Sequence, residues 1–140
     1  MGIIDKMQDF VRHIEQQLQT VDGEIEKIHL LILLQLTYFD KNQAMSTIML
    51  SEEVFHLNAG LKRKLEVIIG SRYRLLTSLL QAAQDKKLII TENVTDLASL
   101  IMGTIRMIIF QWKLENYRFS LSQRGKSIVS VLLKMMLRNK

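Results

Sequence analysis

The feature that most constrains this chain is a nearly unbroken apolar run over residues 97–112, interrupted by a few polar residues that include Ser99, Thr104 and Arg106. As a helix, the run would carry apolar side chains on every side. Such a helix has to be covered on every side. The core of one small domain covers one face only, so the opposite face indicates a partner subunit, a ligand, or both.

The chain has 140 residues and contains neither proline nor cysteine. Because proline interrupts helix interiors, its absence favours long continuous helices. Without cysteine there is no disulfide framework and no thiolate metal site. The N-terminus lacks a signal-peptide pattern, and the apolar runs at 30–39 and 97–112 are shorter than the roughly twenty clean apolar residues that a membrane span needs. We therefore expect one cytoplasmic domain over residues 1–140.

Apolar residues recur at steps of three and four along the whole chain, which is the pattern of amphipathic helices. The spacing predicts an all-α bundle of about six helices, over residues 3–21, 24–39, 43–50, 59–87, 93–117 and 120–138. Residues 54–57 either continue a bent third helix or form a separate short one. The helix over 24–39 is apolar on most sides and is expected at the centre. Asn93 with Asp96, and Ser120 with Gln123, have the spacing of helix-capping pairs.

Charge is unevenly distributed along the chain. Residues 1–60 carry four Lys or Arg against nine Asp or Glu, a net −5, and residues 61–140 carry fifteen against five, a net +10. One interpretation is that the two halves attract each other within the fold. The other is a basic surface for nucleic acid or anionic lipid. The basic residues are scattered and are not interleaved with aromatic residues, which argues against the second interpretation.

No pattern in the chain indicates catalysis. His13, His29 and His56 are far apart, and none has a second ligand type one helical turn away. The sequence has no Ser-His-Asp order of the kind found in catalytic triads and no GxSxG elbow. It also has no glycine-rich phosphate loop. We expect no catalytic residues, no metal and no cofactor, and hence no enzyme.

Three residues within the apolar run need an explanation. Gly103 costs a helix about 1 kcal/mol relative to alanine. With Ser99 one turn earlier it forms a strip of small residues, suited to close helix packing or to a pocket wall. Arg106 has to reach solvent, pair across a dimer, or meet an anionic ligand. Trp112 is either an interface anchor or ordinary core.

An ordered set of landmarks resembles the C-terminal regulatory domain of TetR/AcrR-type transcriptional regulators. The best part is a mid-helix Gly-Thr-Ile with a tryptophan nine residues after the glycine, followed by an aromatic residue and a leucine at the next cap: Gly103, Thr104, Ile105, Trp112, Phe119 and Leu121. The stretch with Leu50, Ser51, Glu52, Glu53, Phe55, Asn58 and Leu65 is also similar. In two respects the chain departs from the family. Lys87 stands where the family often has a glycine, and the helix-turn-helix expected before Ile3 is absent from this sequence.

The resemblance implies an effector-binding and dimerisation domain, most simply of a repressor, whose ligand shifts the spacing of DNA-binding heads that are not in this sequence. It implies a two-fold homodimer through the last two helices and a small, mostly apolar effector, with DNA contacted only through the missing module and no membrane contact. From apolar face and helix position, the candidate ligand-binding residues are Phe39, Met45, Phe55, Ile69, Tyr73, Met102 and Arg106. The candidate dimer-interface residues are Ile109, Trp112, Ile128, Val131, Leu132 and Met135.

Two alternatives to this function remain. The chain could be a stand-alone helical protein-interaction domain that docks an acidic partner through its basic second half. It could also be a helical protein of the membrane surface.

Overall fold

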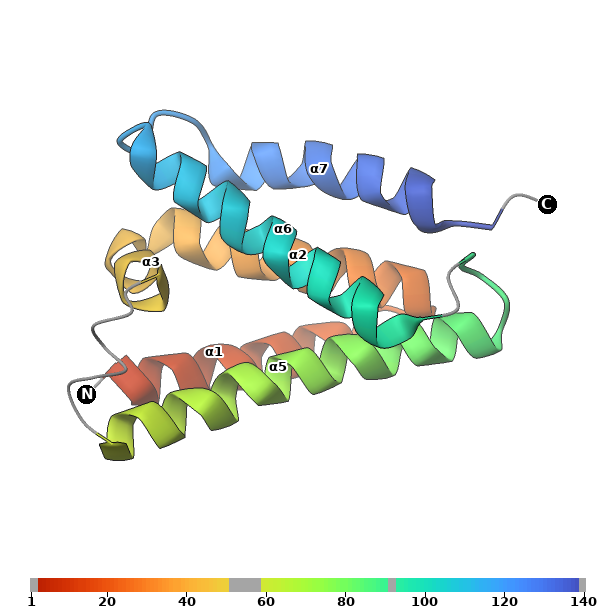
Figure 1. Ribbon diagram of the computed structural model, residues 1–140, viewed down its shortest axis with the longest axis horizontal. Helices are drawn as coiled ribbons and strands as arrows, with labels where there is room; N and C mark the ends of the chain where they lie inside the picture. Colours follow the sequence, from red (N-terminus) through yellow and green to blue (C-terminus); the bar gives the residue numbers. More distant parts are fainter. Residues whose placement is uncertain (1–2, 51–58, 91–92, 139–140) are drawn as a thin grey trace.

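Six helices account for most of the chain that the structure describes, which comprises residues 3–50, 59–90 and 93–138 of a computed structural model (Figure 1). They are α1 (Ile3–Leu18), α2 (Glu24–Lys41), α3 (Gln43–Leu50), α5 (Ala59–Asp85), α6 (Val94–Leu114) and α7 (Leu121–Met136). Within these ranges the only β-type pairing is an isolated antiparallel bridge between Ile89 and Leu137. The prediction of an all-α bundle is confirmed. Residues 54–57, where the sequence left two alternatives open, lie outside the described residues.

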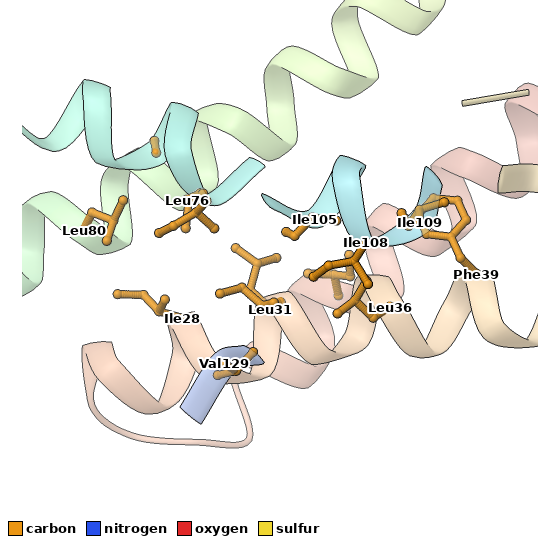
Figure 2. Close-up of a cluster of buried hydrophobic side chains, with 14 of the residues drawn as sticks. Ile28, Leu31, Leu36, Phe39, Leu76, Leu80, Ile105, Ile108, Ile109 and Val129 are labelled. Atoms are coloured by element: carbon orange, nitrogen blue, oxygen red, sulfur yellow. The ribbon is translucent and has the colours of Figure 1, made fainter. Parts of the chain in front are cut away.

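Helix α2 is the centre of the bundle, as its apolar sequence predicts. It contacts α1, α3, α5, α6 and α7. In Figure 1 it lies between the pair α1 and α5 on one side and α7 on the other, and α6 crosses it obliquely. Figure 2 shows how side chains of α5, α6 and α7 converge on α2. The labelled members of this core are Ile28, Leu31, Leu36, Phe39, Leu76, Leu80, Ile105, Ile108, Ile109 and Val129.

Both predicted helix caps are present. The side-chain oxygen of Asn93 accepts a hydrogen bond from the backbone N–H of Asp96 at 2.9 Å, and α6 begins at the next residue, Val94. The hydroxyl of Ser120 accepts from the N–H of Gln123 at 3.2 Å at the start of α7. Each cap satisfies a donor that the first helical turn leaves free.

Lys87, which stands where the family often has a glycine, adopts a backbone conformation that glycine usually takes. It has a positive φ of 60°. The N–H of Leu88 donates to the carbonyl of Ala83 at 2.9 Å, and the N–H of Lys87 donates to the carbonyl of Gln84, also at 2.9 Å. This is the Schellman pattern of a helix end, in which glycine usually occupies the left-handed position. The turn therefore forms without glycine, at some cost in backbone strain.

Trp112 fixes the corner between α6 and α7. Asn116 takes the left-handed position of a second Schellman turn, with the N–H of Tyr117 donating to the carbonyl of Trp112 at 2.8 Å. The rings of Trp112 and Tyr117 pack edge to face, with their centroids 4.7 Å apart. The indole N–H of Trp112 donates to the carbonyl of Phe119 at 3.0 Å. The tryptophan thus satisfies its one donor within its own chain.

Two contacts hold α7 on α2. At Gly125 a Cβ atom would lie 2.5 Å from Cδ1 of Leu36, so only a glycine permits this approach. At the N-terminus of α7, Oδ2 of Asp40 accepts hydrogen bonds from the N–H of Ser122 at 3.0 Å, from its hydroxyl at 2.9 Å and from the hydroxyl of Ser120 at 3.3 Å. Burial raises the pKa of Asp40, but these donors outweigh burial, and the pKa lies below its ordinary value.

One exposed ion pair joins the acidic and basic halves of the chain. Nζ of Lys86, at the end of α5, lies 2.7 Å from Oε1 of Glu24, at the start of α2. The hydrogen bond from Lys86 lowers the pKa of Glu24. The ion pairs Arg12–Asp9 and Lys62–Glu66 each lie within one half, so of these three contacts the Lys86–Glu24 pair alone joins the halves. It accounts for little of the charge difference, so most of the basic side chains of the second half stay on the surface.

Candidate functional site

The outward face of α6 and α7 carries a line of apolar residues, most of which are left exposed by the part of the chain that the structure describes. We call it the seam. On α6 it repeats at steps of three and four, which is the spacing of a helix that packs lengthwise on another helix. The seam comprises Leu100, Gly103, Met107, Phe110 and Leu114 of α6, continued by Ile128, Val131 and Met135 of α7. Leu100 and Met135 are each 68% exposed.

A shallow groove of about 420 Å³ runs along the seam, between α6 and Ile128 of α7. Its walls are Ser99, Leu100, Gly103, Thr104, Met107, Ile108, Gln111 and Ile128. Nothing lies within 4 Å of the position that a Cβ would take at Gly103. The strip of small residues therefore faces open space and leaves room for another helix to approach.

The predicted interface residues fall into two groups. Val131 and Met135 are exposed members of the seam, Ile128 is a half-buried member of it, and Leu132 is half-buried beside it. Ile109 and Trp112, at 0% and 1% exposure, are covered within the protomer itself. An interface on this face would therefore be formed by the exposed seam residues, four of which on α6 the sequence reasoning did not name: Leu100, Met107, Phe110 and Leu114.

A buried polar pair lies between α2 and α5. Arg72 is 4% exposed and Gln35 is 1% exposed. Nη1 of Arg72 donates to Oε1 of Gln35 at 3.3 Å, and Nε2 of Gln35 donates to the carbonyl of Leu31 at 3.4 Å. Nε and Nη2 of Arg72 are buried and have no hydrogen-bond partner among the described residues. Burial lowers the pKa of Arg72 to about 10, so the guanidinium remains charged at neutral pH.

Arg72 lines a small cavity of about 10 Å³, which is room for about one water molecule. Two of the predicted ligand-binding residues, Phe39 and Met45, line the same cavity. The other lining residues come from α1, α2 and α5: Met7, Phe10, Val11, Tyr38 and Ile68. The rings of Phe10 and Tyr38 stack with centroids 4.0 Å apart, and burial raises the pKa of Tyr38. Apart from Arg72, the wall is therefore apolar or aromatic.

Of the remaining predicted pocket residues, the four that the structure describes do not line this cavity. Tyr73 is half-buried, and its hydroxyl donates to the carbonyl of Thr95 at 3.1 Å, which ties α5 to the start of α6. Ile69 and Met102 are half-buried, and Arg106 is exposed to solvent. Phe55 lies outside the described residues. The structure thus brings two of the seven candidates together around the cavity.

Arg72 is the functional candidate that sequence reasoning missed, although the sequence contains a signal. The apolar stripe of α5 includes Ile68 and Leu76, and Arg72 stands four residues from each. Residues four apart share one helix face. A charge in register with a stripe that is expected to be buried is therefore a candidate for burial.

Within the described ranges no three His, Cys, Asp or Glu side chains are grouped so that they could hold a metal ion. By length and composition α6 could cross a membrane. Core helices of soluble proteins meet the same test, and α6 buries one side against α2 and α5. Neither observation adds a second kind of site.

Comparison with solved structures identifies the fold. The chain superposes with a TM-score of 0.80 on the transcriptional regulator FadR from Bacillus subtilis, solved in complex with stearoyl-CoA, at 19% identity over 94% of this chain and 71% of that one. The fatty acid degradation regulator FadR from Bacillus halodurans gives a TM-score of 0.79 at 21% identity, over 93% and 67%. At these identities the likeness establishes the fold, that of the C-terminal domain of TetR-type regulators.

The family follows from the sequence itself. Residues 3–135 match the TetR C-terminal family described as YsiA-like protein, C-terminal region, and the chain belongs to this family. A comparison with curated proteins finds no match. The predicted resemblance is confirmed, and the chain is an effector-binding regulatory domain of a TetR-type transcriptional regulator. This assignment favours the regulator over the two alternatives considered from the sequence.

Proposed function

We propose that this domain forms a two-fold dimer through the seam and that an effector with a long apolar part binds between α1, α2, α3 and α5. The whole protein would be a cytoplasmic repressor that contacts DNA through a separate N-terminal module. The observation that carries the proposal is the seam. Apolar residues at heptad-like spacing, exposed on two neighbouring helices, suit a second copy of the same two helices.

A four-helix interface would account for the apolar character of α6 on every side. One face packs on α2 and α5 within the chain. The opposite face, with Leu100, Met107 and Leu114, would be removed from water only in the dimer. Burial of apolar area contributes about 25 cal/mol per Å², so large exposed side chains on both copies supply the driving force.

The effector proposal rests on the cavity beside Phe39 and Met45. The B. subtilis structure with a similar fold is a complex with stearoyl-CoA, a molecule with a long apolar chain. A ligand that enters beside α1 would change the packing of α1 on α5. Helix α1 resembles the helix that follows the DNA-binding module in this family. A shift of α1 would therefore change the spacing of the DNA-binding heads. Such a ligand acts by binding one arrangement more tightly than the other.

Cysteine cross-linking tests the dimer directly, because the native chain contains no cysteine. Four single variants each place one thiol along the seam: Leu100→Cys, Gly103→Cys, Met107→Cys and Phe110→Cys. Val67→Cys on α5 is the control, because Val67 is also exposed but lies away from the seam. Mild oxidation is expected to give covalent dimers at one or more seam positions, those nearest the two-fold axis. Equal or greater cross-linking at Val67 would contradict the proposed interface.

A further inference from the structure

The two unpartnered donors of Arg72 are adjacent nitrogens. In a guanidinium, Nε–H and the nearer N–H of Nη2 point in the same direction and form a fork. The third nitrogen, Nη1, is the one that donates to Gln35. Such a fork matches the two oxygens of a carboxylate, which can accept both hydrogen bonds at once. The part of Arg72 that lacks a partner is thus the part that recognises carboxylates.

Nothing described in the chain supplies that carboxylate. The cavity wall is otherwise Met7, Phe10, Val11, Tyr38, Phe39, Met45 and Ile68, and Tyr38 is its only other titratable side chain. A buried charge with no counter-charge is unfavourable, and an apolar side chain of similar size would pack well here. The missing partner of Arg72 is therefore a single negatively charged group, which suits the charged end of a small molecule.

A surface groove provides a route to this point. A cleft of about 330 Å³ lies between α1 and α5, lined by Gln8, Val11, Arg12, Val67, Ile68 and Ser71. Val11 and Ile68 also line the Arg72 cavity, so these two side chains separate the groove from the guanidinium. Val67 is 61% exposed at the groove and offers apolar surface outside. Displacement of Val11 and Ile68 would join the two spaces.

We propose that the effector of this domain is a free carboxylic acid with an apolar chain, a fatty acid, whose carboxylate binds the Nε–Nη2 fork of Arg72 while its chain leads outward between Val11 and Ile68. The inference rests on the proposed effector-binding function and specifies the ligand class. An acyl ester or thioester presents only a neutral carbonyl at this position and so offers no pair of negatively charged oxygens to the fork. The site therefore selects the free acid over its esters.

Calorimetric titration tests this selection with three probes of equal chain length: decanoic acid, its methyl ester and decanoyl-CoA. The intact chain is expected to bind the acid at least about tenfold more tightly than the ester, since hydrogen bonds to a charged group are the strongest kind. Arg72→Met should abolish that preference. Arg72→Lys keeps the charge without the fork and should retain part of it. Arg74→Met, on the exposed side of the same helix, should leave it unchanged.

A spectroscopic readout separates ligation from a structural effect of the substitutions. With decanoic acid labelled with ¹³C at its carboxyl carbon, the bound resonance in the intact protein should stay at the carboxylate position while the pH falls through the ordinary range of carboxylic acids. In Arg72→Lys, which keeps the charge but lacks the fork, the carboxyl group of the bound acid should titrate closer to its ordinary pKa. Arg12→Met tests whether the cation at the groove mouth takes the same role.

The outcomes are distinguishable. Equal affinity for acid and ester in the intact protein, or a preference that survives Arg72→Met, would overturn the carboxylate assignment and leave effector binding in place. A preference lost in Arg12→Met but kept in Arg72→Met would move the anion to the groove mouth and also overturn it. Binding of none of the three probes would count against the proposed effector site itself.

Discussion

The seam and the Arg72 cavity depart from the usual arrangement of a globular domain in opposite directions. On α6 and α7 large apolar side chains are exposed, whereas between α2 and α5 a charged side chain is buried. The first departure extends along two helices, which an equally long partner surface would cover. The second is one fork of two donors, which one small anionic group would satisfy. The two departures therefore fit two different proposals, a subunit interface at the seam and a ligand site at Arg72.

The two helical glycines of these regions show the same contrast. Gly125 is already covered by Leu36 of the same chain, whereas the Cβ position at Gly103 has nothing within 4 Å. The first glycine serves a contact that exists within the protomer. The second leaves open space in the seam, where the proposed dimer would place the second copy.

The largest expected effect is on assembly. Val131→Glu would place a charge in the proposed interface on both copies, and a buried charge without a partner costs several kcal/mol. We expect sedimentation velocity to show a monomer at concentrations where the native chain is dimeric. Val67→Glu, at 61% exposure against 56% for Val131, introduces the same charge on a different face and should leave the dimer intact. A dimeric Val131→Glu protein would mean that the seam is not the interface.

The next largest effect compares the two glycines. Gly125→Ala should lower the free energy of unfolding by about 1–3 kcal/mol, because the added methyl group overpacks against the fully buried Leu36. Gly103→Ala should raise it by up to about 1 kcal/mol, because alanine favours the helix and meets no neighbour. Both are measured by denaturant unfolding in the monomeric Val131→Glu background. Equal losses at both positions would remove the distinction drawn between the two regions.

Arg72→Met should have a smaller effect, and it should stabilise the fold, whereas most substitutions of buried residues destabilise it. In the absence of ligand we expect the free energy of unfolding to rise by about 1 kcal/mol, because a charge with two unpartnered donors is replaced by an apolar side chain. The loss of a donor to Gln35 offsets part of the gain. Denaturant unfolding without added fatty acid measures the difference. A strongly destabilised variant would show that Arg72 supports the fold rather than a ligand.

The smallest effect concerns the contact between α2 and α7. Asp40→Ala should lower the free energy of unfolding by about 1 kcal/mol at neutral pH, since the N–H of Ser122 loses its acceptor. Because the pKa of Asp40 is lowered in the fold, its contribution is present above the ordinary value of 3.8 and is lost as the pH falls through the folded value. Unfolding curves of the two proteins should therefore converge in acid. A difference that persists there would assign the effect to packing.

The sequence predicts the elements of this fold well because their signals are local. The caps at Asn93 and Ser120 involve residues three apart, and both form as expected. The apolar character of α6 on every side indicates two covered faces, and the structure covers one of them. The turn at Lys87 also follows from its neighbours, although the sequence alone did not show that lysine would take the left-handed position.

The site depends on contacts between distant parts of the chain, which the sequence does not display. Arg72 is buried because α1, α2 and α3 pack over its side of α5. Arg106 is equally surrounded by apolar residues in sequence but points to solvent. Trp112 has the character of an interface anchor, yet the carbonyl of Phe119 satisfies its indole N–H within the corner. Whether a side chain serves core, ligand or partner is decided by what packs beside it.

A native mass spectrum of the chain with decanoic acid tests the central claim most directly, because it reports assembly and ligand together. We predict a species of twice the protomer mass of 16.3 kDa, carrying added mass in steps of one decanoic acid and not in steps of its methyl ester. A single species at 16.3 kDa that takes up acid and ester alike would contradict both the seam as an interface and Arg72 as the anion receptor.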